Sequence, residues 1–87
     1  MKTYEISQRI FELRTLFGLS QHQLALLAGT SQAVISKYED ENYDGHSVRM
    51  LQRIADALQC NLSITLAPRN GFVNIEEKHK RKTKDRN

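Results

Sequence analysis

The sequence predicts a mainly α fold in which four short helices are followed by one β-strand and a basic tail. Apolar residues recur at helical spacing in four segments of the first 58 residues. Serines and glycines separate these segments where helices ought to begin and end. The pattern then changes to a short apolar–polar alternation, and Lys and Arg follow. We therefore expect a helical domain over 1–60, a strand over 61–68 and a flexible tail over 69–87.

The first helix is predicted from Tyr4 to Phe17 and should end at Gly18. Its apolar stripe consists of Ile6, Ile10, Leu13, Leu16 and Phe17. The second helix is predicted from Gln21 to Ala28, because Ser20 is suited to cap it and Gln23 lies three residues later. Gly29 should end this helix, since glycine readily takes a positive φ. The apolar positions of the second helix are Leu24, Ala25, Leu27 and Ala28.

The third helix is predicted from Gln32 to Tyr38 or Glu39, with Ser31 as its cap. Its buried stripe should be Val34, Ile35 and Tyr38, which leaves four residues on the outer face: Gln32, Ala33, Ser36 and Lys37. Residues 40–46 are rich in Asp, Asn and Gly and predict a loop. Ser47 should cap a fourth helix, whose apolar stripe is Val48, Leu51, Ile54, Ala55 and Leu58.

A strand is predicted where Leu62, Ile64 and Leu66 alternate with Ser63 and Thr65, before Pro68. A single strand needs a partner. The simplest partner is the same segment of a second copy, paired antiparallel in a two-fold homodimer. The alternative is an extended segment packed on the chain's own helices. A chain of 87 residues buries only about 60–65% of its surface on folding, so we expect marginal stability or dimerisation.

Composition excludes several classes of function. The chain has one cysteine, Cys60, which predicts neither a disulfide scaffold nor a zinc finger but a free thiol in a reducing cytoplasm. No apolar run is long enough to span a bilayer, so no membrane partner is expected. Three scattered histidines, His22, His46 and His79, are predicted to lie on the surface. Since no nucleophile–base pair or metal-ligand spacing is present, we expect no enzyme activity, no cofactor and no metal.

The excess of positive over negative charge lies entirely in the C-terminal residues. The whole chain carries a net charge of +3, and residues 76–87 alone contain six Lys/Arg and three acids. Residues 1–75 therefore contain seven of each and are neutral. The tail from Glu76 onward has few apolar residues, so we expect it to be disordered. It is either a solvated tail or a source of non-specific phosphate contacts.

The segment RIFELRTLFGLSQHQLALLAGTSQAVISKYE resembles the Cro/cI-repressor (Xre) class of helix-turn-helix proteins. The shared landmarks are LSQ opening the second helix, LA before the turn, Gly29 within it and SQ opening the third helix, with Ile35 and Glu39 following. The later RIADAL is also typical, and the resemblance covers about residues 6–60. It implies a lambda-repressor-like domain that binds double-stranded DNA. Thr30, where the class often has valine, and the acidic 40–46 loop depart from the pattern.

The predicted site follows from the outer face of the third helix. The Gln32 amide suits adenine N6 and N7, the Ala33 methyl suits thymine, and Lys37 suits guanine or a phosphate. Ser36 is less informative, since its hydroxyl is equally suited to bond a helical carbonyl. The full set of expected DNA-binding residues is Gln21, Ser31, Gln32, Ala33, Ser36, Lys37, Asn42 and Tyr43. The resemblance also implies a structural ion pair between Arg14 and Glu39.

The expected function is that of a homodimeric, sequence-specific transcriptional repressor. The 40–46 loop and the LSITL segment make the chain resemble small antitoxin-repressors of toxin–antitoxin operons. The antitoxin that partners a HipA-type kinase is the most similar, and the HigA class is a near alternative. This resemblance implies autoregulation of the operon and a toxin partner. The alternatives are a phage-type or restriction-controller regulator without a toxin, and a protein-interaction module without DNA function.

Overall fold

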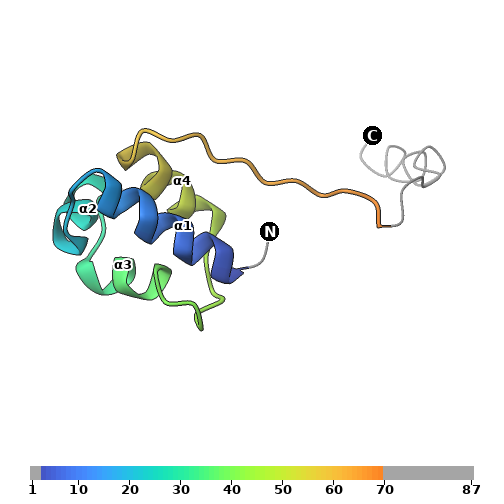
Figure 1. Cartoon of the computed structure of the whole chain (residues 1–87), viewed down its shortest axis with the longest axis horizontal. Coiled ribbons are helices and arrows are strands. Elements are labelled where there is room, and N and C mark those ends of the chain that lie inside the picture. The colour runs from blue at the N-terminus through green and yellow to red at the C-terminus, as the bar shows by residue number, and fades with distance from the viewer. Residues whose placement is uncertain (1–2, 70–87) are drawn as a thin grey trace, which may run out of the picture.

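Helix α2 (Gln21–Ala28) packs against both α3 (Gln32–Tyr38) and α4 (Val48–Ala57). The computed structural model describes residues 3–69, and its first helix, α1 (Thr3–Leu16), lies across the others (Figure 1). The bounds of α2 and α3 are those predicted, whereas α1 begins and ends one residue earlier than expected. None of these four helices is long and apolar enough to cross a membrane.

Serine side chains begin the three later helices. Ser20 accepts a hydrogen bond from the Gln23 amide at 3.0 Å, and the Gln23 side chain accepts one from the Ser20 amide at 2.8 Å. These reciprocal bonds satisfy two backbone N–H groups that a helix start leaves unpaired. Ser31 and Ser47 each accept a bond from the amide three residues later, at 3.2 and 3.1 Å. The predicted caps are therefore confirmed at all three positions.

The turn between α2 and α3 depends on Gly29, whose φ of 70° lies in the left-handed region. The Thr30 amide then donates to the carbonyl of Ala25 at 2.9 Å, which satisfies a carbonyl in the last turn of α2. Only the three residues 29–31 separate the end of α2 from the start of α3.

All four helices and the residue after α4 contribute to one apolar core. Leu24, Ile35 and Ile54, from α2, α3 and α4, are the most deeply buried hydrophobic residues, with exposures of 0–1%. The other buried hydrophobic residues are Ile10, Ala25, Ala28, Tyr38, Leu51, Ala55 and Leu58. Because α2 and α3 share this core, the orientation of α3 is set mainly by its packing on α2.

Four residues that the apolar stripes assigned to the core are exposed. Leu16 and Phe17 are 73% and 52% exposed, because the core covers the stripe of α1 only as far as Leu13. Leu27 is 61% exposed, since it lies outside the arc of Leu24, Ala25 and Ala28 by which α2 is buried. Val48 is 59% exposed at the first position of α4. Apolar periodicity thus predicted the helices but overestimated the buried face.

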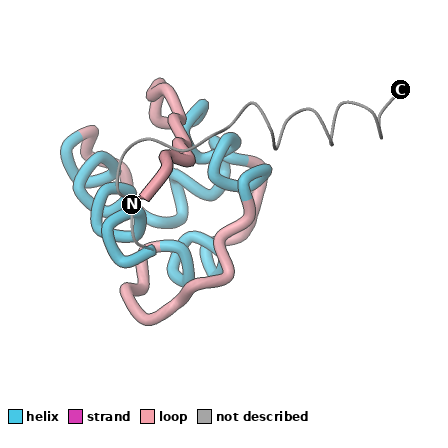
Figure 2. The backbone as a smooth tube through the Cα atoms, turned by 90° about the vertical axis from the view of Figure 1, so that its right-hand side faces the viewer, coloured by secondary structure: helices cyan, strands magenta, loops and turns pink. Residues whose placement is uncertain are grey.

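Residues 61–68 leave the helices as an extended segment (Figure 1), and the described residues contain only helix and loop (Figure 2). Leu62 packs partly on the core, but Ile64 and Leu66 are 60% and 98% exposed. Within residues 3–69 the predicted strand is not formed, because no second segment there supplies its backbone partners. The predicted disordered tail, 69–87, lies outside the described residues from position 70 onward.

Candidate nucleic-acid interface

Helix α3 has one buried and one exposed face. Ile35 and Tyr38 are only 0% and 5% exposed. The exposed residues occur at spacings of one, four and five along the helix, which places them on a common outer face: Gln32, Ala33, Ser36 and Lys37. We call this set the α3 outer face. It presents an amide, a methyl group, a hydroxyl and an ammonium group, all of which suit the edges of base pairs.

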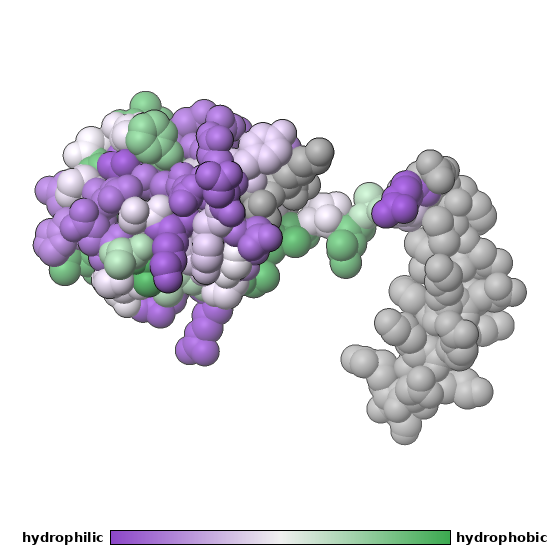
Figure 3. All heavy atoms as spheres, turned by 90° about the horizontal axis from the view of Figure 1, so that it is seen from below, coloured by the Kyte–Doolittle hydropathy of each residue, from purple (hydrophilic) through white to green (hydrophobic). Residues whose placement is uncertain are grey.

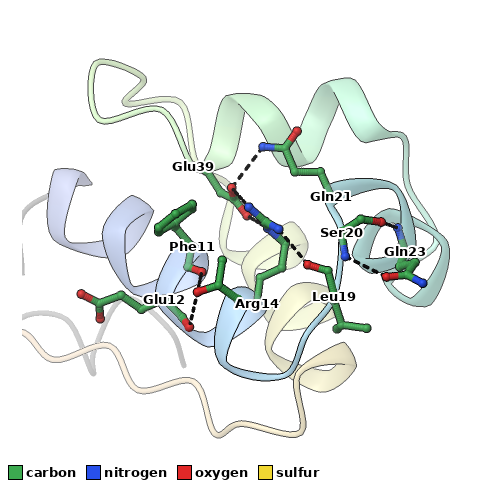
Figure 4. A network of polar contacts seen from close by, with 9 residues as sticks. Phe11, Glu12, Arg14, Leu19, Ser20, Gln21, Gln23 and Glu39 are labelled. Carbon is green, nitrogen blue, oxygen red and sulfur yellow. Dashed lines mark hydrogen bonds and ion pairs between the residues drawn. The ribbon is translucent and has the colours of Figure 1, made fainter.

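The C-terminal end of α3 is fixed by an ion pair with α1. Arg14 Nε donates to Glu39 Oε2 at 2.5 Å, and Arg14 Nη2 donates to Glu39 Oε1 at 3.0 Å (Figure 4). The side chains are 11% and 5% exposed. Arg14 Nη1 also donates to the Leu19 carbonyl at 2.7 Å. One guanidinium thus joins α1, the loop before α2 and the residue that caps α3.

Gln21 belongs to the same network. Its side-chain Nε2 donates to Glu39 Oε1 at 3.1 Å, and the side chain points toward the carboxylate in Figure 4. The sequence predicted a phosphate contact for this residue, but the structure shows a half-buried amide with a partner inside the protein. An amide nitrogen carries two hydrogens, so this bond leaves one for another acceptor.

The remaining predicted contacts differ in how free their side chains are. Ser31 is exposed, and its hydroxyl already caps α3. Asn42 is also exposed, and its backbone N–H donates to Asp40 Oδ1 at 2.9 Å in a local turn. The ring of Tyr43 packs 5.6 Å from that of Tyr38, and its hydroxyl donates to the Gly45 carbonyl at 3.1 Å. Tyr43 is therefore half-buried in the protein rather than freely exposed.

His46 is half-buried rather than on the surface, contrary to the sequence prediction. Its ring lies 4.6 Å from that of Tyr38, and its Nε2 lies 3.1 Å from the Tyr38 carbonyl oxygen and 3.2 Å from Ser7 Oγ. Ser7 is fully buried and donates to the Asp40 carbonyl at 3.1 Å. Ser7 lies beside the apolar stripe of α1, so its burial could have been predicted from the sequence. The burial of His46 could not, because Ser7, which its ring contacts, is 39 residues away in the chain.

The charge of this region is low. Lys37 is the one Lys or Arg in α2 and α3, and Glu39 is paired with Arg14. The following loop contains three acids, Asp40, Glu41 and Asp44. Contacts to phosphates near α3 would therefore rely on amides, hydroxyls and backbone N–H groups rather than on a basic patch. Within residues 3–69, no three His, Cys, Asp or Glu side chains come together as a metal site would require.

Comparison with known proteins places this geometry in a family. A family model described as helix-turn-helix matches residues 10–64. The restriction-modification controller protein C.AhdI from Aeromonas hydrophila is 32% identical and superposes with a TM-score of 0.63, over 68% of this chain and 84% of that protein. No curated protein sequence matches the chain.

Two further solved structures share the fold. A chain of the HipA–HipB–O2–O3 complex is 22% identical, with a TM-score of 0.67 over 78% of this chain and 94% of that chain. A protein described as the MDT protein gives the same TM-score and coverage at 24% identity. The family match spans more than half of the chain and includes the whole of α2, α3 and α4. The chain therefore belongs to the Xre-type helix-turn-helix family, HTH_3, and has the fold of a DNA-binding regulator.

Proposed function

We propose that this protein is a homodimeric repressor that binds double-stranded DNA in a sequence-specific manner. The observation that carries the proposal is the α3 outer face, on which Gln32 and Lys37 are exposed beside small side chains while the opposite face of the helix is buried. A helix of this kind fits the major groove. Two copies would place two such helices in half-sites about 34 Å apart, or a multiple of that distance, along one side of the duplex.

Each residue of the α3 outer face is assigned a chemical role. Gln32 offers a donor and an acceptor that match N7 and N6 of adenine. Ala33 places a methyl group against the methyl of thymine, and Lys37 donates to guanine O6 and N7 or to a phosphate. Ser36 has room for one hydrogen bond to a base edge. These direct contacts would carry the sequence preference of the protein.

Phosphate contacts would set the register on the duplex without reading sequence. The residues proposed for this role flank the α3 outer face: Gln21, Ser31, Asn42 and Tyr43. Gln21 would use the second hydrogen of its amide, because the first is bonded to Glu39. Tyr43 is the weakest member of the set, since its hydroxyl already donates to Gly45.

The test is a selection of operators from a random duplex library, followed by affinity measurements at two salt concentrations. We expect Gln32→Ala to weaken operator binding about tenfold or more and to relax the preference at one base position. If Lys37 binds a phosphate, Lys37→Ala should lower the slope of log K against log salt by about one. Gln8→Ala is the matched control, because Gln8 is an exposed glutamine on α1.

Two results would contradict this function. One is a wild-type protein that prefers no sequence and loses no affinity with salt, which would favour a protein-interaction module that keeps the fold. The other is unchanged operator binding in the Gln32→Ala/Lys37→Ala double variant, which would show that the α3 outer face is not the reading surface.

Within this function, we propose that the protein is the antitoxin of a toxin–antitoxin operon, that it represses its own promoter, and that it binds the toxin. Support comes from the resemblance of the sequence to such antitoxins and from the fold shared with a chain of the HipA–HipB–O2–O3 complex over 78% of this protein. A restriction-modification controller is the second candidate, favoured by the 32% identity with C.AhdI.

The neighbouring gene distinguishes these two candidates. An antitoxin should form a stable complex with the product of the adjacent gene, and this product should inhibit growth when it is expressed alone. A controller should instead lie beside genes for a DNA methyltransferase and an endonuclease. An adjacent gene of the second kind would contradict the antitoxin proposal while leaving the DNA-binding function intact.

A further inference from the structure

Arg53 reaches from α4 to the end of α2. Its Nε donates to the Ala28 carbonyl at 3.0 Å, and its Nη2 donates to the Gly29 carbonyl. Ala28 is the last residue of α2, and Gly29 is the cap that starts the turn into α3. Carbonyls at the end of a helix lack partners within the helix. A guanidinium presents its N–H groups in a fixed fork, so it constrains both the position and the direction of this turn.

The close approach of Arg53 adds a second requirement for glycine at position 29. A Cβ on Gly29 would lie 2.7 Å from Arg53 Nη2, so an alanine there would displace the guanidinium. Gly18 has almost the same φ, 71° against 70° for Gly29, but nothing lies within 4 Å of its Cβ position. Alanine at Gly18 therefore introduces only the strain of a left-handed backbone. Alanine at Gly29 introduces the same strain and also displaces Arg53.

An arginine from another helix thus contacts each end of α3. Arg14 binds Glu39 where α3 ends, and Arg53 binds the turn from which α3 begins. Helix α3 has seven residues, of which two, Ile35 and Tyr38, are buried. Packing on α2 sets the general orientation of α3, and the two arginine contacts fix the positions of its ends.

We propose that Arg53 is a positioning residue for DNA recognition, which acts by fixing the turn that aims the α3 outer face. This inference rests on the proposed DNA-binding function. A positioning role differs measurably from two simpler roles. Loss of stability alone would weaken binding to all duplexes equally, and loss of a direct phosphate contact would reduce the salt slope by about one. Loss of positioning lowers the affinity for the operator more than the affinity for unrelated DNA.

The first experiment compares Arg53→Ala, Arg53→Lys and the control Arg49→Ala, an exposed arginine on the same helix. Affinities are measured for the selected operator and for an unrelated duplex, each at several salt concentrations. We expect Arg53→Ala to lower the ratio of the two affinities about tenfold, the discrimination that one good base contact carries, without a change in salt slope. Arg53→Lys should recover part of this ratio, and Arg49→Ala should leave it unchanged. The proposal would be overturned if Arg53→Ala lowered the affinity for both duplexes equally, or if it reduced the slope of log K against log salt by about one.

The second experiment needs no DNA and separates this inference from the proposed function. Gly29→Ala should melt about 4–8 °C lower than Gly18→Ala, because it loses a hydrogen bond in addition to the shared strain. This difference should disappear when Arg53→Ala is present in both. Arg53→Ala should also speed amide exchange in residues 30–36, while the buried residues of α4 keep their protection. If wild-type protein reads no sequence, the proposed function fails, but these results still decide whether Arg53 holds the turn. An unchanged difference or unchanged exchange overturns its role.

Discussion

At the scale of single residues, Glu39 shows how a buried charge orients a helix. Its carboxylate is 5% exposed and accepts hydrogen bonds from two nitrogens of Arg14 and from Gln21. A buried pair of this kind adds little net stability, because both ions lose their hydration. Its consequence is geometric, since the carboxylate is satisfied in one arrangement of α1, α2 and α3. If a donor is removed, the Glu39 carboxylate stays buried and loses a hydrogen bond that water cannot replace.

The first prediction at this scale concerns Arg14. We expect Arg14→Ala to lower the free energy of unfolding by about 3–5 kcal/mol, because Glu39 is left buried without its counter-ion. Urea unfolding followed by circular dichroism measures the change. The control is Arg9→Ala, which breaks an ion pair with Glu12 whose side chains are 67% and 62% exposed, and should cost less than about 1 kcal/mol. Similar losses for the two variants would show that burial of the pair has no energetic consequence.

Sequence could predict part of this site because exposure on a short helix is a local property. The spacing of Gln32, Ala33, Ser36 and Lys37 relative to Ile35 was enough to place all four on the surface. Their contacts with bases remain a prediction. The bonds from Gln21 to Glu39 and from Arg53 to Ala28 join residues 18 and 25 positions apart, and no local pattern encodes such a distance. Contacts of this kind depend on how the helices cross, which no local sequence pattern specifies.

At the scale of elements, helix bounds were predictable where side chains specify them. Ser20, Gly29 and Ser31 fix three helix ends through cap bonds and a left-handed φ, and the predicted bounds of α2 and α3 match the structure. The burial of each apolar stripe was less predictable. Only part of the apolar face of a short helix contacts the core, and the remaining apolar residues stay exposed. Leu27 is exposed for that reason. The segment at 61–68 has strand character in sequence, but pairing needs a second backbone.

The prediction for this scale concerns the cap of α2. Ser20→Ala removes one of the two bonds of the capping box and leaves the Gln23 amide without its acceptor. We expect a loss of about 1 kcal/mol in the free energy of unfolding. Thermal melting measures it, with Ser63→Ala as the control, because Ser63 is exposed outside the helices. If Ser20→Ala melted at the same temperature as Ser63→Ala, the cap at Ser20 would make no contribution to stability.

At the scale of the whole molecule, the net charge of the helical domain supplies no general attraction to DNA. Residues 1–75 are neutral, and α2 and α3 contribute one Lys or Arg between them. One such domain would bind weakly, whereas two linked domains gain from a high effective concentration at the second half-site. The exposed apolar side chains of the segment that leaves the domain (Figure 3) are suited to join two copies, because Ile64 and Leu66 are 60% and 98% exposed in the single chain.

The last prediction tests this joining segment. Proline at Ile64 removes a backbone donor and resists the ladder geometry, so we expect Ile64→Pro to sediment as a monomer. Operator affinity should then fall about 100-fold or more, while binding to a duplex with one half-site stays the same. Ile64→Val is the matched control, because it keeps both the β-branched side chain and the backbone N–H. An Ile64→Pro protein that remains dimeric would place the interface elsewhere. A monomer that keeps full operator affinity would instead show that one domain is sufficient for recognition.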